Sequence, residues 1–362
     1  MRMTHGFPRM LPAIIDNMSS PRNTDDWQPD VLGPDFQALT LPLGVDAEGD
    51  VVATLVRHHP RETAAIIRRL PYPRHPREAF EGWDVLYVHG WNDYFFQAHV
   101  AQWFTERGAR FYALDLRKYG RSLREGQTPG LITNLDEYDR DIEAALTAMA
   151  RDTSALAGRR LALFGHSTGG LVLSLWADRH PGRAQALLLN SPWLELQARA
   201  VGRQVLAPVL DLQTRVDPSF TLPSIDLGFY ARTVSDEFDG EWHYNETWRR
   251  NRGFGVPSVW LSAVLAGHRR VAEGLDVQAP ILTLLSSTST LSSTWRESMR
   301  HSDCVINVED VARRALRLGH EVTVTRVDDA VHDVFLSRRS VRDRAFAAIE
   351  RWATGYAATT RP

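Results

Sequence analysis

Short apolar runs alternate with longer amphipathic segments along most of the chain. Seven runs have the length and composition of strands: Val51–Arg57, Val85–Val88, Arg110–Leu114, Arg160–Phe164, Ala186–Leu189, Ile281–Leu285 and Glu321–Val327. Several of them are apolar throughout, which is typical of a sheet covered by helices on both faces. Five further segments have a helical period: Phe96–Glu106, Leu135–Met149, Val172–Arg179, Val308–Leu318 and Ser340–Ala353. The pattern predicts an α/β fold with a mostly parallel central sheet flanked by helices.

Two stretches depart from this alternation. Residues 1–40 are rich in Pro, Asn, Asp and Ser without a sustained period, and we interpret them as a loose N-terminal arm. Residues 194–279 separate two strand-like runs by far more chain than elsewhere, and they carry several aromatic residues among charged ones. We interpret this segment as an insertion that caps the active edge of the sheet. The core is then formed by residues 41–193 and 280–362.

The composition is that of a globular protein. Of the 362 residues, 43% are hydrophobic and 24% are charged, which is enough apolar side chain for a sizeable core. Lys and Arg total 42 and Asp and Glu total 44, for a net charge of -2, so the chain has no basic field that would hold a polyanion. We therefore expect a small-molecule substrate and no nucleic-acid partner.

The single cysteine, Cys304, excludes an internal disulfide framework and a cysteine-based zinc site. The N-terminal residues contain no uninterrupted apolar stretch of the length that a signal peptide needs. No later stretch approaches the roughly 18 apolar residues of a membrane-spanning helix. We expect a soluble cytoplasmic protein with no transmembrane segment, no cofactor and no metal. Peripheral membrane contact and the oligomeric state stay open.

A candidate nucleophile lies between a strand-like run and a helical segment. The sequence Gly165-His166-Ser167-Thr168-Gly169 follows the run LALF and precedes LVLSLWADR. Strand, tight turn and helix in this order are the context of a nucleophile elbow, in which glycines let the strand and the helix approach closely. Ser167 would then stand at a helix N-terminus, where the helix dipole favours developing negative charge. A serine hydroxyl also needs a base and a group that orients the base.

His332 is the candidate base, because it follows the last strand-like run and precedes the C-terminal helix, where a loop reaches the carboxyl edge of the sheet. Asp303 is the candidate acid, because it follows the preceding run and comes shortly before an expected helix N-cap. Glu297, Glu309 and Asp310 are the alternatives for the acid. For Glu309 and Asp310, favourable charge in the first turn of a helix is the simpler explanation.

The run that ends in His89 and Gly90 supplies a candidate oxyanion hole. Gly90 allows the chain to turn tightly, so that the main-chain N–H of Trp91 joins the N–H of Thr168 at the developing oxyanion. His-Gly by itself is more often a simple turn. Its place two strand-like runs before the elbow is what favours the functional interpretation.

Six segments together resemble the α/β-hydrolase superfamily, and within it the branch of monoacylglycerol lipases, lysophospholipases and serine aminopeptidases. The segments are YVHGW (87–91), LDLRKYGRS (114–122), LFGHSTGG (163–170), NSPW (190–193), SDCV (302–305) and AVHDVFLS (330–337). The resemblance extends over residues 50–355. It implies the α/β-hydrolase fold with an inserted cap and a serine hydrolase activity.

The chain departs from the family pattern at two places. After the fourth strand the family has Asp-x-Arg-Gly-x-Gly-x-Ser, whereas here Lys118 stands in place of the first glycine and Tyr119 follows it. The loop that carries Asp303 is also longer than the usual acid loop. We therefore expect differences in the shape of the acyl pocket.

These residues predict serine-dependent hydrolysis of carboxylic esters through an acyl-enzyme on Ser167. The aromatic residues of the insertion favour an apolar acyl group, such as that of a monoacylglycerol or a lysophospholipid. An amidase or peptidase with the same triad is one alternative, because the nucleophile does not choose the leaving group. A non-catalytic ligand-binding protein on the same fold is another.

Overall fold

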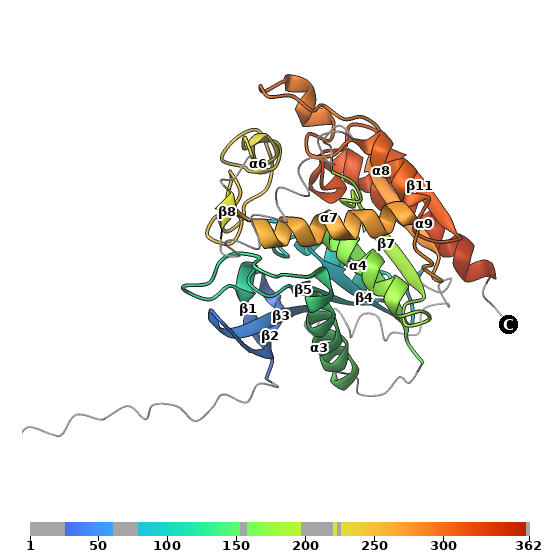
Figure 1. Ribbon diagram of the computed structural model, residues 1–362. Coiled ribbons are helices and arrows are strands. Elements are labelled where there is room, and N and C mark those ends of the chain that lie inside the picture. The colour runs from blue at the N-terminus through green and yellow to red at the C-terminus, as the bar shows by residue number, and fades with distance from the viewer. Residues whose placement is uncertain (1–25, 61–78, 153–157, 197–219, 223–225, 360–362) are drawn as a thin grey trace, which may run out of the picture.

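A mixed, mostly parallel sheet forms the centre of the structure. The computed structural model describes residues 26–60, 79–152, 158–196, 220–222 and 226–359. Nine strands lie in the order β1-β2-β3-β5-β4-β6-β7-β10-β11 (Figure 1). Their bounds are β1 Gln28–Asp30, β2 Gly33–Asp46, β3 Gly49–His58, β4 Trp83–Val88, β5 Arg110–Asp115, β6 Arg160–His166, β7 Ala186–Asn190, β10 Ile281–Ser286 and β11 Val322–Val327. The six strands from β5 to β11 in this order run parallel, and antiparallel pairing joins β1, β2 and β3 to them.

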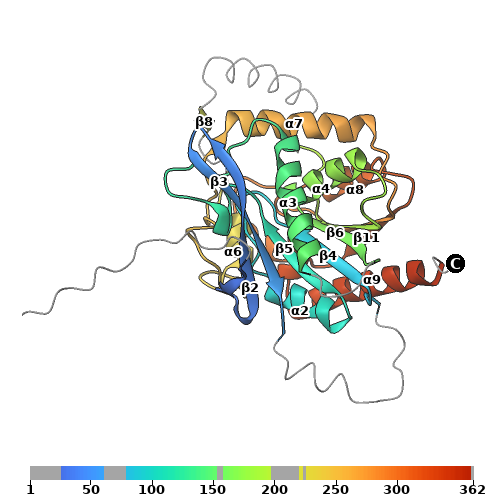
Figure 2. The same cartoon turned by 90° about the horizontal axis from the view of Figure 1, so that it is seen from below.

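Helices cover both faces of this sheet. They are α2 (Ala98–Glu106), α3 (Tyr138–Arg151), α4 (Thr168–Arg179), α7 (Ser258–Glu273), α8 (Val308–Ala315) and α9 (Arg339–Thr359). A further helix, α6 (Phe229–Val234), lies in the insertion, and the 3₁₀ turns are η1 (Gly120–Ser122), η2 (Leu135–Glu137), η3 (Glu297–His301) and η4 (Val334–Leu336). Figure 2 shows α2 and α9 on one face and α3, α4, α7 and α8 on the other. Within the described residues, no helix combines the length and the apolar character needed to cross a membrane.

Strand β4 shows why the central runs lack polar alternation. Val85 and Tyr87 pack into the cluster that includes α2 and α9, whereas Leu86 and Val88 pack into the cluster that includes α3, α4 and α7. All four side chains are at most 1% exposed. Successive residues of a strand point to opposite faces, so covering both faces makes every position apolar.

The predicted elements of the body are confirmed. Each of the seven strand-like runs overlaps an observed strand, and the five helical segments overlap α2, α3, α4, α8 and α9. Among the first residues of these elements, the predicted and observed positions differ most for α4, which begins at Thr168 rather than at Val172. Its first turn is built of glycines, which carry no periodic signal.

Residues 28–40 correct the interpretation of an N-terminal arm, because they form β1 and the first part of β2. In β2 alternate leucines from Leu39 to Leu43 are buried in the core. Pro42 hides this alternation in the sequence, and it is tolerated because it coincides with a bulge against β3. Residues 1–25 lie outside the described part of the chain.

The insertion has two parts among its described residues. Helix α7 runs along α4 (Figure 1), and Gly267 is so close to the body that a Cβ there would stand 2.8 Å from Leu135 Cδ1. This helix therefore belongs to the helical layer of the body, although the predicted boundary at residue 279 places it in the cap. The other part contains α6 and the pair β8 (Thr221–Leu222) and β9 (Val256–Pro257). Residues 197–219 and 223–225 of the insertion lie outside the described residues.

Lys118 takes the place of the family glycine without changing the backbone conformation that glycine favours. Its φ is +61°, in the left-handed region. Its buried ammonium group Nζ lies 2.6 Å from a carboxylate oxygen of Asp46 and 2.6 Å from one of Glu48, at the hairpin between β2 and β3. These ion pairs offset the unfavourable backbone and hold the loop after β5 against the hairpin.

Replacement Lys118→Met keeps the aliphatic stem and removes both ion pairs, so we expect a loss of about 1 to 3 kcal/mol in the free energy of unfolding at pH 7. Burial would raise the pKa of Asp46 and of Glu48, but the Lys118 hydrogen bond and charge outweigh burial and lower both pKa values from their ordinary 3.8 and 4.5. Their contribution is therefore complete above about pH 4.5 and is lost as the pH falls through the lowered values.

Urea unfolding of wild type and variant at several pH values measures this difference. The exposed pair of Arg183 and Glu143 provides a control, since Arg183→Met should cost less than about 1 kcal/mol. A difference between wild type and Lys118→Met that is the same at pH 7 and pH 3 would contradict the ion-pair explanation.

Candidate active site

The candidate nucleophile stands in a strained turn between β6 and α4. Ser167 has φ +50° and ψ −117°, a conformation that non-glycine residues rarely adopt. A Cβ on Gly165 would lie 2.6 Å from Gly170 Cα, and one on Gly169 would overlap the main-chain oxygens of Val88 and of the next residue. The glycines therefore let the start of α4 press against β4 and β6, and Ser167 is pushed out at the carboxyl edge of the sheet.

The structure brings the three predicted triad residues together. The His332 Nε2 atom lies 3.1 Å from Ser167 Oγ, and the His332 Nδ1 atom lies 2.8 Å from Asp303 Oδ2. Asp303 is fully buried, His332 is 2% exposed and Ser167 is 9% exposed. If Nδ1–H donates to the carboxylate, Nε2 is the lone-pair atom that accepts the serine proton.

The longer acid loop does not displace Asp303. The chain leaves the sheet after β10 and makes an excursion over residues 289–302. Two main-chain hydrogen bonds close its base: Asp303 N–H donates to Thr288 O at 3.0 Å, and Thr290 N–H donates to Asp303 O at 2.8 Å. The Asp303 Oδ1 atom accepts from the N–H groups of Val305 and Ile306 at 2.7 and 2.9 Å, which turns Oδ2 toward the histidine.

The alternative acids lie away from His332. Glu297 has a side chain that is 71% exposed and pairs with Arg300. Glu309 is 58% exposed and pairs with Arg326, whereas Asp310 is 38% exposed and is 3.3 Å from Arg313. Both of these last two carboxylates stand in the first turn of α8.

Two free main-chain donors flank the serine. A Cβ on Gly90 would lie 2.9 Å from Ser167 Cβ, so the chain after β4 passes directly beside the nucleophile. Within the described residues, neither the N–H of Trp91 nor the N–H of Thr168 donates a hydrogen bond to another protein group. Both are thus available to an oxyanion formed on a substrate bound to Ser167.

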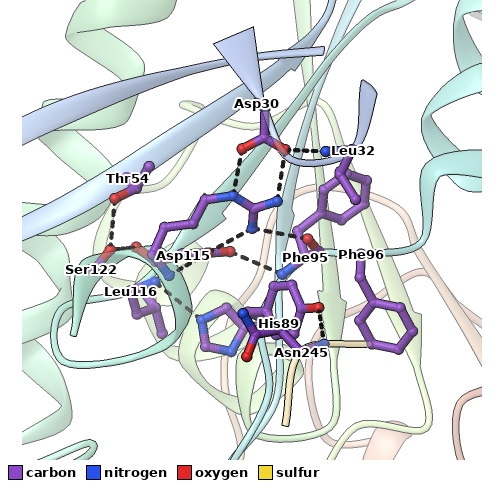
Figure 3. Close-up of polar contacts among 12 residues, drawn as sticks. Asp30, Leu32, Thr54, His89, Phe95, Phe96, Asp115, Leu116, Ser122 and Asn245 are labelled. Atoms are coloured by element: carbon purple, nitrogen blue, oxygen red, sulfur yellow. Dashed lines mark hydrogen bonds and ion pairs between the residues drawn. The ribbon is translucent and has the colours of Figure 1, made fainter. Parts of the chain in front are cut away.

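His89 orients the first of these donors. Leu116 N–H donates to His89 Nε2 at 3.1 Å (Figure 3), which makes Nδ1 the protonated nitrogen. Nδ1 then donates to Gly90 O at 2.7 Å. In a trans peptide the carbonyl and the following N–H point in opposite directions, so holding Gly90 O aims the N–H of Trp91 the other way. Burial lowers the pKa of His89, which keeps this imidazole neutral near pH 7.

A buried ion cluster supports the same loop. The Arg121 guanidinium makes two hydrogen bonds to the Asp30 carboxylate, of 2.7 and 2.8 Å, and a third of 2.9 Å to Asp115 Oδ2. The other oxygen of Asp115 accepts the N–H of Phe95 at 2.9 Å (Figure 3). Strand β1, which the sequence does not reveal, is therefore tied through Arg121 to the loop that follows Trp91.

Asn190, at the end of β7, connects the elbow to the histidine loop. Its main-chain oxygen accepts the N–H of Ser167 at 3.0 Å and lies 3.1 Å from His166 Nδ1. Its side chain donates to Asp333 Oδ1 at 2.7 Å and accepts from the N–H of Val334 at 3.1 Å. Asn190 and Asp333 lie in the segments NSPW and AVHDVFLS, but the sequence alone gives no sign of their roles, because each depends on a distant partner.

Asp333 and His166 form a second buried layer under the triad. Burial would raise the pKa of Asp333. The positive charge that His166 carries when it is protonated in acid, together with hydrogen bonds from Asn190, Gln97 and Phe335, outweighs burial and lowers that pKa. Burial lowers the pKa of His166 to about 4, and the charge of Asp333 only partly opposes this shift. His166 is therefore neutral at pH 7.

A cavity of about 430 Å³ adjoins Ser167, and it has an apolar and a polar side. On the apolar side the ring of Trp260 lies between those of Trp91 and Trp193, at centroid distances of 3.8 and 6.1 Å. Leucine and valine side chains of the insertion extend this wall: Leu196, Leu222, Val256 and Leu261. The three indole rings come from three separate segments, so the sequence does not show that they form one surface.

The polar side of the cavity is next to His332. The Tyr230 ring stands edge-on to the His332 imidazole at 5.2 Å, and the Arg249 guanidinium lies 5.1 Å from the Tyr230 ring. Arg249 Nε is 3.1 Å from Asp93 Oδ1, with both side chains 4% exposed. Burial raises the pKa of Asp93 to about 7, although the charge of Arg249 opposes this shift. The described residues contain no group of three or more side chains placed to hold a metal ion.

The fold is that of an α/β-hydrolase, and Ser167 lies in the tight turn between β6 and α4. Residues 82–296 match the family described as serine aminopeptidase S33, and the chain belongs to this family. It is 30% identical to the monoacylglycerol lipase of Mycolicibacterium smegmatis over 149 residues, which are 41% of this chain and 50% of that protein. The chain therefore spans about half the length of this curated relative.

Solved structures of lipases and esterases share the fold. The monoacylglycerol lipase of Paleococcus ferrophilus has a TM-score of 0.55 at 17% identity, over 75% of this chain and 94% of that one. The carboxyl esterase of Bacillus coagulans has a TM-score of 0.57 at 16% identity, over 89% of this chain and 99% of that one. At these identities the likeness concerns the fold.

The buried His166 should make the structure sensitive to acid. Its pKa of about 4 lies below the ordinary 6.5, so the unfolded chain binds a proton that the folded chain does not. The stability that this difference supplies is complete above about pH 6.5 and is lost as the pH falls toward 4. Variant His166→Gln should lose less stability than wild type over this interval.

Urea unfolding at pH 7.5 and pH 5 compares the two slopes. The exposed His243 provides the matched control, since His243→Gln should keep the wild-type slope. Equal slopes for wild type and His166→Gln would show that another group determines the acid sensitivity.

Proposed function

We propose that the protein hydrolyses carboxylic esters through an acyl-enzyme on Ser167. The observation that carries this proposal is the continuous contact from Asp303 through His332 to Ser167, with two free N–H groups beside the serine. The relatives described as monoacylglycerol lipases and esterases support the same reaction.

Each group has one role in this mechanism. His332 Nε2 accepts the proton of Ser167 while Oγ attacks the acyl carbonyl carbon. The N–H groups of Trp91 and Thr168 stabilise the oxyanion of the tetrahedral intermediate. His332 then protonates the leaving oxygen, and it later activates the water molecule that hydrolyses the acyl-enzyme. Asp303 keeps the Nδ1 proton in place and stabilises the imidazolium form.

The two sides of the cavity support an ester with an apolar acyl group and a polar alcohol. The tryptophan wall provides an apolar surface for an acyl chain. Tyr230, Arg249 and Asp93 lie on the side of His332, which is the group that must reach the leaving oxygen. A monoacylglycerol or a lysophospholipid has both parts, and we propose this class of substrate.

Labelling with a fluorophosphonate tests the activated serine. Wild type should carry the adduct on Ser167, and Ser167→Ala should carry none. His332→Ala should react at least about a thousandfold more slowly, because the hydroxyl has lost its base. Peptide mass spectrometry locates the adduct, and circular dichroism confirms that each variant is folded. A folded wild-type protein that stays unlabelled would favour the ligand-binding alternative.

A substrate panel tests the leaving group and the acyl chain. We expect hydrolysis of p-nitrophenyl esters with kcat/KM rising from acetyl to medium or long acyl chains, and hydrolysis of a 1-monoacylglycerol. Aminoacyl-p-nitroanilides should react more slowly by at least about a hundredfold. Faster cleavage of the anilides would show that the protein is an amidase or peptidase with this triad.

A further inference from the structure

Residues 242–250 of the insertion, here called the bridging segment, touch the loop that supplies the oxyanion donor. Three consecutive residues follow Trp91, and each is bound by this segment. The Asn92 side chain donates to Arg250 O at 2.8 Å and accepts from the N–H of Arg250 at 3.1 Å. These two hydrogen bonds to the main chain of Arg250 fix both the position and the rotation of the Asn92 side-chain amide.

The next two residues are held in the same way. Asp93 pairs with Arg249, and each side chain is only 4% exposed, so water compensates neither charge well. The Tyr94 hydroxyl accepts the N–H of Asn245 at 2.8 Å. Each residue of loop 92–94 is therefore bound to the bridging segment.

The backbone conformation of Asn92 connects these contacts to the neighbouring donor, the N–H of Trp91. Asn92 has φ +54°, in the left-handed region, so the chain reverses its direction directly after Trp91. The peptide plane that carries the N–H of Trp91 joins Gly90 to Trp91, and the next plane joins Trp91 to Asn92. Fixing Asn92 therefore limits the rotation of Trp91 between these two planes. His89 holds the preceding carbonyl at Gly90. The Trp91 amide is thus fixed from the body on one side and from the insertion on the other.

A separate hydrophobic cluster joins the same segment to the histidine loop. Its buried members are Tyr94 and Phe96 from the chain that follows Trp91, Val234 and Tyr244 from the insertion, and Leu336 from the turn after His332. It is distinct from the two clusters on the faces of the sheet. The Trp242 Nε1 atom also donates to Leu336 O at 2.7 Å. The bridging segment therefore contacts both the loop of the oxyanion donor and the loop of the base.

We propose that the bridging segment is a positioning element of the catalytic site, in which Asn92 and Arg249 set the Trp91 N–H for oxyanion binding. The proposal rests on the proposed function, because it concerns the same acyl transfer. A displaced oxyanion donor stabilises the transition state less, whereas substrate binding in the ground state stays nearly unchanged. The insertion thus acts on the chemical step as well as on the shape of the cavity.

Steady-state kinetics with a p-nitrophenyl ester tests this role in the full chain. Asn92→Gly removes both bonds to Arg250 and retains a residue that accepts φ +54°, so the backbone is not strained. We expect kcat to fall about tenfold to a hundredfold with KM within about twofold of wild type. The decrease should be the same for two acyl chain lengths. Inhibition by a boronic acid, which forms a tetrahedral adduct on the serine, should weaken by a similar factor.

The ion pair is tested by Arg249→Met and by the double variant Asp93→Asn/Arg249→Met, which leaves no unpaired buried charge if the single variant fails to fold. Both should lower kcat for the p-nitrophenyl ester as Asn92→Gly does. KM is compared only in Asn92→Gly, because Asp93 and Arg249 also lie on the polar side of the cavity. The control is Arg232→Gln. It breaks an ion pair within the insertion, in which Arg232 Nε lies 2.6 Å from Asp239 Oδ2. This pair does not involve loop 92–94. It should keep the wild-type kcat.

Two results would overturn the proposal. A raised KM at unchanged kcat, differing between substrates, would show that Asn92 and Arg249 contact the substrate and do not position the amide. Wild-type kcat in Asn92→Gly and in the double variant would show that the oxyanion donor needs no support from the insertion. Failure of the proposed function is seen separately, since the wild-type protein itself would then not hydrolyse the ester.

Discussion

Close backbone packing where α4 meets β4 and β6 is the constraint on which the rest of the site depends. No methyl group fits at Gly165 or at Gly169, because main-chain atoms of α4 and β4 already occupy the space. This contact places the start of α4 at the sheet edge, with Ser167 in its unusual dihedral angles directly before Thr168, the first residue of the helix. Each further group is brought to this fixed point by a different loop.

Burying these loops places four carboxylates in the interior around the site, and each has a local partner, although burial still raises the pKa of Asp93 to about 7. Asp303 accepts two main-chain N–H groups, Asp115 accepts a guanidinium and an N–H, and Asp93 pairs with Arg249. Asp333 accepts two side-chain amides and an N–H. An isolated buried charge is costly, so this compensation is required for folding. It also leaves His332 with a single carboxylate partner at Nδ1.

How much the sequence predicts follows from the range of the interactions involved. Burial on both faces and helical periods are local signals, so the body strands and most helices are predictable, and so is the elbow. The expected N-cap at Asn307 is present, with its side chain accepting from two following N–H groups. The choice of Asp303 over Glu297 depends on the hydrogen bonds that close the excursion, which the sequence does not show. The roles of Asn190 and Arg249 depend on partners more than 140 residues away.

The closed base of the excursion separates the acid from the surface loop that precedes it. Hydrogen bonds of Asp303 with Thr288 and Thr290 join the two ends of residues 289–302 at the sheet, while Ser292 within the excursion lines the cavity. A change confined to residues 291–301 would keep these hydrogen bonds of Asp303. Such a change would alter the rim of the cavity at Ser292, while the hydrogen bonds that hold the Asp303 carboxylate next to His332 stay outside the altered residues.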